Sequence, residues 1–167
     1  MTKKKTPPTD GTGSILVPVD FSPVSGHVVT HANELAEATG RGLAILHVVH
    51  DPGEAPGYYR VKGRNKMLRR AEDVAGEMLQ EFVADCRKRH PDSKPLQAAR
   101  SVLVVGLPVT RILEVAKRLE AWSVVMGSAG RTGLSRFLLG SKAEQVLRLC
   151  PLPVTIVKVP LEVEDDG

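Results

Sequence analysis

The feature that most constrains this fold is an alternation of two apolar patterns along the chain. Short runs of branched apolar residues, such as Ile15-Leu16-Val17, alternate with longer segments in which apolar residues recur every three or four positions. The first pattern is typical of buried parallel strands and the second of amphipathic helices. Their alternation predicts βα units around a mostly parallel sheet, and 167 residues correspond to one such domain.

We predict a doubly wound open sheet of five mostly parallel strands with four helices, an architecture that right-handed crossovers favour, and the strand order 3-2-1-4-5. The strands are expected at residues 15–19, 43–49, 97–105, 123–126 and 154–159. In such sheets, ligands bind at the carboxyl ends of the strands, near the point where the strand order reverses.

Proline and glycine mark the expected helix ends. Ser22 and Pro23 are expected to cap and begin the first helix, and Gly40 to end it. A longer helical segment ends near residue 90, and two further helices are expected after Pro108 and Gly140. The long segment has an apolar stripe that we expect to face the core, and its members are Met67, Ala71, Val74, Ala75, Met78, Leu79, Phe82, Val83 and Cys86.

Both ends of the chain differ in composition from the middle. Residues 1–13 are rich in Lys, Thr, Pro and Gly, and residues 161–167 are acidic, so we expect a disordered tail at each end of a domain at 14–160. The chain has 23 Lys and Arg against 19 Asp and Glu, a net charge of +4 with both signs mixed. This balance argues against an intrinsically disordered chain and against a histone-like nucleic-acid binder.

The scarcity of aromatic residues and of long apolar runs narrows the partners further. The chain has 1 Trp, 2 Tyr and 3 Phe, too few for the stacking platforms of proteins that bind single-stranded nucleic acid. The longest stretch without Asp, Glu, Lys or Arg is 21–33, well short of the roughly 20 apolar residues that span a bilayer. We therefore expect a cytoplasmic protein that binds neither nucleic acid nor membrane.

Cysteine and histidine spacing predicts no metal site. Cys86 and Cys150 form no CxxC motif, and we interpret both as small core residues. His27 and His31 have helical i,i+4 spacing but lack the acidic residue of an HExxH motif, so a solvated or capping role is favoured over metal binding.

Asp20 directly follows the first predicted strand, at the carboxyl edge of the sheet. A carboxylate there can accept hydrogen bonds from a ribose hydroxyl or an adenine amine. It can equally cap the first turn of the next helix together with Ser22. The residues alone favour neither role.

The stretch after the fourth strand is rich in glycine, and its candidate ligand-binding residues are Gly127, Gly130, Gly140 and Ser141. Glycine lets backbone N–H groups approach an anion, and a helix N-terminus offers unpaired N–H donors with a partial positive charge. The stretch therefore predicts a phosphate site, to which Arg131 and Lys142 add positive charge. It is neither a Walker A loop nor a GxGxxG motif, so an ordinary turn with solvated basic side chains is the alternative.

Five separated motifs resemble those of the universal stress protein family and occur in the order found there. The spacing Gly127-x2-Gly130-x9-Gly140-Ser141 matches the G-x2-G-x9-G-[ST] nucleotide motif of that family. The other four are Ile15-Leu16-Val17-Pro18-Val19-Asp20-Phe21-Ser22, Leu46-His47-Val48-Val49, Gly106-Leu107-Pro108 and Cys150-Pro151-Leu152-Pro153-Val154. The resemblance covers about residues 14–160 and implies a Rossmann-like α/β fold.

The resemblance also implies a ligand and an assembly. In the ATP-binding branch of the family, the positions matching Asp20 and Val48 hold the adenosine, and the glycine motif lies along the ribose and phosphates. The cofactor-binding residues expected on this basis are Pro18, Val19, Asp20, Val48, Met126, Gly127, Ser128, Gly130, Arg131, Gly140, Ser141 and Lys142. The expected cofactor is ATP, with or without Mg²⁺, while AMP or another adenine nucleotide also fits. The family commonly dimerises through its last strand, here 154–159.

Three positions depart from the family pattern. Ala129 replaces a frequent histidine and Lys142 a small apolar residue, which changes the expected contacts to phosphate. Trp122 stands where an aspartate usually precedes the fourth strand, and we interpret it as a change in packing.

Residues 57–70 contain six basic residues and no acidic one. They are Arg60, Lys62, Arg64, Lys66, Arg69 and Arg70. The segment is interpreted as a solvated basic face of the long helix, with a phosphate lid or a docking patch for an acidic protein as alternatives.

Binding is better supported than catalysis by these residues. No general base or set of Mg²⁺-binding carboxylates accompanies the expected phosphate site, and no GxSxG elbow is present. We therefore predict a dimeric ATP-binding stress protein in which the nucleotide stabilises one conformation that partners recognise. The alternatives are a slow or partner-dependent ATPase or phosphotransferase, and an interaction module that works without nucleotide.

Overall fold

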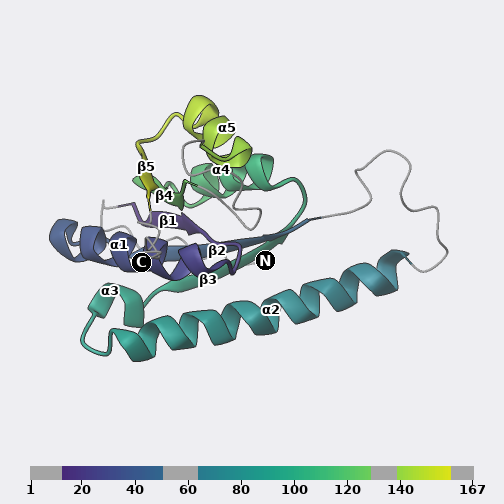
Figure 1. Ribbon diagram of the computed structural model, residues 1–167, viewed down its shortest axis with the longest axis horizontal. Helices are drawn as coiled ribbons and strands as arrows, with labels where there is room; N and C mark the ends of the chain where they lie inside the picture. Colours follow the sequence, from purple (N-terminus) through teal and green to yellow (C-terminus); the bar gives the residue numbers. More distant parts are fainter. Residues whose placement is uncertain (1–12, 51–63, 129–138, 159–167) are drawn as a thin grey trace, which may run out of the picture.

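The computed structural model describes residues 13–50, 64–128 and 139–158, excluding the side chains of 64–70. These residues form five strands and five helices (Figure 1). The strands are β1 (Ile15–Pro18), β2 (Leu43–Val49), β3 (Arg100–Val105), β4 (Ser123–Gly127) and β5 (Val154–Val157). The helices are α1 (Pro23–Thr39), α2 (Arg64–Arg89), α3 (Lys94–Gln97), α4 (Pro108–Arg118) and α5 (Ser141–Leu149).

The predicted strand order is confirmed. The sheet runs β3-β2-β1-β4-β5, and all four of its strand pairings are parallel. The chain moves outward from β1 to β3 on one side and then crosses to β4 on the other, so the order reverses between β1 and β4. Their carboxyl ends therefore meet at the position where open α/β sheets bind ligands.

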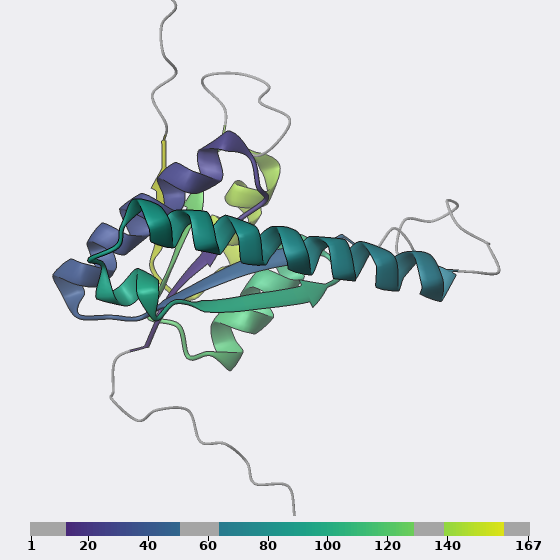
Figure 2. The same cartoon turned by 90° about the horizontal axis from the view of Figure 1, so that it is seen from below.

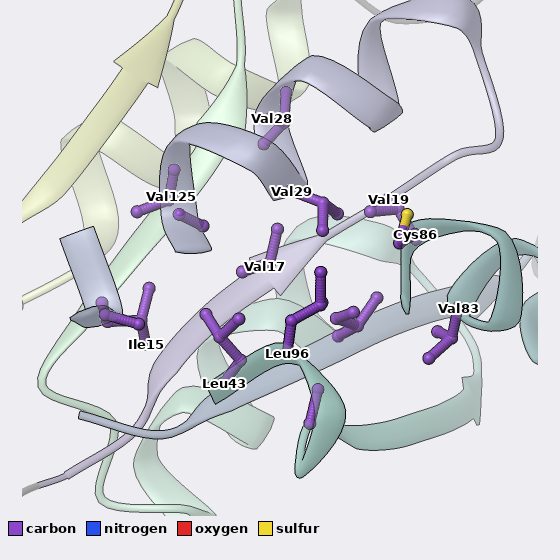
Figure 3. Packing of buried hydrophobic residues seen from close by; sticks show 14 of the residues in the cluster. Ile15, Val17, Val19, Val28, Val29, Leu43, Val83, Cys86, Leu96 and Val125 are labelled. Atoms are coloured by element: carbon purple, nitrogen blue, oxygen red, sulfur yellow. The ribbon is translucent and has the colours of Figure 1, made fainter. Parts of the chain in front are cut away.

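Helices cover both faces of the sheet, as Figures 1 and 2 show. On one face α1, α2 and α3 pack around Ile15, Val17 and Val19, part of which is drawn in Figure 3. On the other face α4 and α5 pack against Leu16. Successive strand residues point to opposite faces, so a strand covered on both sides must be apolar at every position. β1, with the sequence Ile-Leu-Val-Pro, meets this requirement.

The boundaries of α1 agree with the punctuation of the sequence. Ser22 is the N-cap, Pro23 occupies the first turn, and Gly40 is the C-cap with a φ of 66°. The N–H of Gly40 donates to the carbonyl of Ala36, one of the last carbonyls of the helix. A left-handed φ of this kind is adopted by glycine without steric cost.

The prediction for the third strand was wrong at its start, and a fifth helix was missed. The strand begins at Arg100 because 94–97 form α3, a helix of 4 residues. The Oγ of Ser93 caps this helix by accepting from the N–H of Leu96, whose side chain is fully buried. So short a helix has no apolar period that a sequence pattern can detect.

The apolar stripe predicted for α2 is wider than the buried one. Leu79, Val83 and Cys86 are buried as expected, whereas Val74 and Met78 are 49% and 39% exposed. The buried positions follow the narrower line along which α2 crosses β2 and β3. Figure 2 shows α2 running along the sheet and continuing beyond it.

Other predicted boundaries shift by one or two residues, as helix and strand ends commonly do. β1 ends at Pro18, β4 extends to Gly127, and β5 ends at Val157. Residue 159, the predicted end of β5, lies outside the described residues, as do the predicted tails apart from residue 13, and residues 51–63. Among the described helices, none combines the length and apolar character needed to cross a bilayer.

Candidate functional site

A cavity of about 410 Å³ lies at the carboxyl edge of the sheet, where the strand order reverses. Strands β1, β2 and β4 contribute their last residues, and α1, α4 and α5 contribute their first turns. Small-molecule sites commonly enclose about 300–1,000 Å³. The cavity therefore has the size and the place in the fold expected of a ligand site.

The sequence-predicted residues converge on this cavity. Of the twelve, Gly130 and Arg131 lie outside the described residues. The other ten all line the cavity: Pro18, Val19, Asp20, Val48, Met126, Gly127, Ser128, Gly140, Ser141 and Lys142. Residues up to 124 positions apart in the chain are thus brought together by the parallel sheet.

Asp20 caps the start of α1, one of the two roles that its sequence position left open, and it also lies where it could contact a ligand. Its Oδ1 accepts from the N–H of Ser22 and from the Oγ of Ser25, both at 3.0 Å. The carboxylate therefore organises the start of α1, where the Ser22 side chain makes no capping bond. Asp20 also lines the cavity, so one residue shapes both the helix start and the wall of the pocket.

The neighbouring wall comes from the end of β2. The Nδ1 of His47 lies 2.8 Å from the carbonyl oxygen of Val19, and since that oxygen only accepts, Nδ1 carries the proton. The ring of His47 also packs against the ring of Phe21 at a tilt of 31°, with the ring centroids 4.2 Å apart. Phe21 has a φ of 60°, unusual for a bulky residue, and its packing against His47 and Phe82 holds it in place.

The third wall combines the end of β4 with the N-terminus of α5. The N–H of Gly140 donates to the carbonyl of Ser128 at 2.7 Å, which joins the two sides of the glycine motif. Gly140 is the N-cap of α5, so the N–H groups of the first turn open beside Ser141 and Lys142. Helix N-termini attract anions, and the Lys142 ammonium adds a full positive charge on the same turn.

The cavity is also lined by residues that the sequence did not predict as ligand contacts. From the α1 start they include Ser22 and Ser25, and from elsewhere His47, His50, Pro108 and Ile112. The sequence predicts Pro108 as a helix start and as part of a family motif, not as a wall of the cavity. No local pattern marks Pro108 or Ile112 as pocket lining, because α4 reaches the cavity only through the crossover after β3.

Two of the three residues that depart from the family pattern, Lys142 and Trp122, are among the described residues. Lys142 lies at the cavity, as its sequence position predicted. Trp122 is at the opposite end of β4, where its ring lies 4.2 Å beneath the Arg41 guanidinium. Ala129 and residues 57–63 of the basic segment lie outside the described residues.

A family model and several sequence relatives assign the chain to the same protein family. The family model described as universal stress protein family matches residues 12–158. A universal stress protein of Methanocaldococcus jannaschii is 28% identical over 148 residues, covering 87% of this chain and 82% of the relative. One of Mycolicibacterium smegmatis is 31% identical over 144 residues, covering 86% of this chain but 45% of the relative. The chain thus spans about half the length of this second relative.

Solved structures share the fold. The UspA protein of Lactobacillus plantarum superposes with a TM-score of 0.73 at 20% identity, covering 87% of this chain and 98% of that one. A universal stress protein in complex with cAMP gives 0.58 at 21% identity, covering 89% and 99%. One from Archaeoglobus fulgidus in complex with dAMP gives 0.56 at 24% identity, covering 87% and 98%.

Proposed function

This chain belongs to the universal stress protein family, and we propose that its cavity binds an adenine nucleotide, with ATP as the preferred ligand. The observation that carries the proposal is the convergence of ten residues from four separated segments on one cavity at the reversal of the strand order. Two structural neighbours were solved with cAMP and dAMP, so the same fold holds adenine nucleotides in other proteins.

The adenosine is assigned to the walls formed by the ends of β1, β2 and β4. Val48 and Met126 offer apolar surface for the flat base, and Asp20 offers a carboxylate for a ribose hydroxyl or the adenine amine. Apolar walls with a few placed polar groups are typical of small-molecule sites. Asp20 is suited to this task because its hydrogen bonds to Ser22 and Ser25 fix its position.

The phosphates are assigned to the N-terminus of α5. Ser141 supplies its backbone N–H and its hydroxyl, and Lys142 supplies its backbone N–H and a cation. Lysine acts here as a point charge, which favours a longer and more highly charged phosphate chain. This is the reason to propose ATP, with Mg²⁺ arriving on the triphosphate, rather than a nucleoside monophosphate.

We further propose that the protein is a homodimer joined through the outer edge of β5 and acts as a nucleotide-dependent switch. β5 is the last strand of the sheet order, and an unpaired apolar edge is an aggregation hazard that pairing removes. β5 is also hydrogen-bonded to β4, which ends in the cavity, since Ser128 N donates to Val157 O at 3.0 Å. A bound nucleotide is therefore connected to the dimer edge through one strand.

Titration calorimetry of nucleotide-stripped protein tests the binding. ATP is expected to bind with micromolar affinity, about −8 kcal/mol, and more tightly than AMP or GTP. Gly140→Val is expected to abolish binding, because Gly140 has a φ of −60° that valine also adopts, so the main effect is a branched side chain at the phosphates. Gly42→Val is the matched control, because it makes the same change just before β2, at the amino end of the strands. A Cβ there has its nearest neighbour at 3.8 Å.

The outcomes are distinct. Loss of ATP binding in Gly140→Val but not in Gly42→Val supports the assignment, and the absence of heat with every nucleotide in the wild type refutes it. Release of ADP in the same samples measures turnover and tests the ATPase alternative. Light scattering across a concentration series, with amide exchange at Ile156, tests the β5 dimer.

A further inference from the structure

The outer edge of β3 carries backbone groups left unpaired by the described residues, and an arginine side chain binds a backbone carbonyl at each of its two ends. β3 is the first strand in the sheet order, and no strand of the described part of the chain pairs with its outer side. The carbonyl of Ala99, just before the strand, accepts from Arg87 Nη2 at 2.9 Å, and that of Val105 accepts from Arg111 Nε at 2.8 Å. The arginines mark the limits of a short segment along which backbone groups face outward.

The register identifies the outward groups. Gly106 donates its N–H inward to Val49 O at 2.9 Å, and inward and outward residues alternate along a strand. The N–H and C=O groups of Ser101 and Leu103 therefore point away from the sheet. Such groups are a template for another extended chain, which gains affinity from main-chain hydrogen bonds.

A shallow groove runs between this edge and α2. It is lined by Glu72, Asp73, Gly76, Glu77, Gln80 and Leu103. Glycine is among the poorest helix formers, yet a Cβ at Gly76 would lie 3.7 Å from Leu103 Cδ2, an ordinary contact. Packing against Leu103 therefore does not require a glycine at this position. The effect of Gly76 is to leave the groove wider than a residue with a side chain would.

The charge of the groove selects the occupant. Residues 71–86 of α2 contain five acidic residues and no Lys or Arg, and three of the five acids line the groove. Asp73 and Glu77 are exposed and one helical turn apart, about 6 Å along the axis. Alternate side chains of a strand are about 6.6 Å apart, so basic residues at i and i+2 of an added strand match these two acids.

From this edge, groove and charge we propose that β3 binds an extended segment of a partner protein with Lys or Arg at alternate positions, which joins the sheet as a further strand. The partner is opposite in charge to the acidic protein that residues 57–70 suggested from the sequence. The surface is formed by β3 and α2, away from the nucleotide cavity, and it does not depend on the proposed nucleotide binding.

A labelled peptide of sequence Lys-Val-Lys-Val-Lys-Thr, added to the full-length protein, tests the proposal. Fluorescence anisotropy is expected to show saturable binding that weakens with salt, and amide exchange is expected to slow at Ser101 and Leu103. Glu77→Lys should lower the affinity about tenfold. Glu81→Lys reverses the same charge one turn along α2 but outside the groove, and should leave the affinity unchanged.

A second variant isolates the strand edge. Ser101 is exposed, and Ser101→Pro removes an outward N–H that the sheet does not use, a change that edge strands tolerate. This variant should lose the peptide while keeping its urea midpoint and its response to ATP. Equal effects of Glu77→Lys and Glu81→Lys, equal binding of a peptide with Glu in place of Lys, or exchange protection elsewhere would overturn the proposal. A dimer that Ser101→Pro dissociates would assign the edge to a second copy of the chain instead.

Discussion

His47 donates from Nδ1 to the carbonyl oxygen of Val19 across 2.8 Å, which ties the end of β2 to the residue that precedes Asp20. β1 itself ends at Pro18, so this side-chain bond continues the connection between the two strands past the end of β1. Val19 is 7% exposed, and water has little access to replace the donor. The bond therefore helps to hold one wall of the cavity against the other.

Replacing this donor should weaken both the fold and the proposed binding of ATP. His47→Leu leaves the Val19 carbonyl buried without its donor, which we expect to lower the free energy of unfolding by about 1–3 kcal/mol. The ATP affinity is expected to fall as well, because the position of Asp20 is less restricted. Urea titration and calorimetry measure the two effects.

His47→Asn is the control for that variant, because the amide nitrogen of asparagine occupies nearly the position of Nδ1 and can donate to the same carbonyl. It should recover most of the affinity lost in His47→Leu. Equal affinities in the two variants would show that the hydrogen bond does not support the cavity.

Lys142 should distinguish nucleotides by the length of their phosphate chain. Lys142→Gln removes one exposed positive charge at the start of α5, and ATP binding is expected to weaken about five- to tenfold at low salt. AMP should be affected less, and the difference should shrink as salt is added. Lys117→Gln, an exposed lysine on α4 that does not line the cavity, is the control. Calorimetry at two salt concentrations decides, and an equal loss for ATP and AMP would contradict the assignment.

The buried hydrogen bond between α1 and the start of α3 should contribute strongly to stability. Ser93 Oγ donates to Asn33 Oδ1 at 2.6 Å, and the two residues are 5% and 4% exposed. Ser93→Ala removes this bond and the cap of α3, which should cost about 2–3 kcal/mol in urea unfolding. Ser101→Ala, at an exposed serine, should change stability little. Asn33→Ala combined with Ser93→Ala should cost less than the sum of the single changes, and strict additivity would rule out the coupling.

The Cys86 thiol should be unreactive and should make stability depend on alkaline pH. Burial disfavours the thiolate and raises the pKa of Cys86 above its ordinary value of 9.0, although Arg89, whose Nη2 lies 3.5 Å from the sulfur, acts in the opposite direction. At neutral pH both the folded and the unfolded chain keep the thiol proton. Above about pH 9 the unfolded chain loses the thiol proton first. The free energy of unfolding therefore falls as the pH rises toward the higher pKa of the folded chain.

Urea midpoints between pH 8 and pH 10.5 measure this effect. The midpoint of the wild type should decline more steeply than that of Cys86→Ala, which lacks the thiol. At pH 8, a thiol reagent should modify Cys150, which is partly exposed, well before Cys86. Faster modification of Cys86 would mean that α2 opens far more often than its packing suggests.

The order of strands and helices could be predicted from the sequence because each signal is local. Branched apolar runs, Pro23 and Gly40 specify elements by the backbone angles and faces they allow, and right-handed crossovers then favour a doubly wound open sheet. Asp20 and Gly127 could be identified for a related reason: they lie at strand ends, and all carboxyl ends of a parallel sheet lie on one edge. Their convergence on one cavity follows from that geometry.

The tertiary structure decided what depends on neighbours distant in the chain. The line along which α2 crosses the sheet determines that Val74 and Met78 are exposed, although the helical period alone would bury them. Ile112 reaches the cavity only through the placement of α4, and His47 serves the cavity only because β2 lies beside β1. Such contacts depend on the packing of whole elements, and a sequence pattern specifies the face that an element buries but not which side chains meet across it.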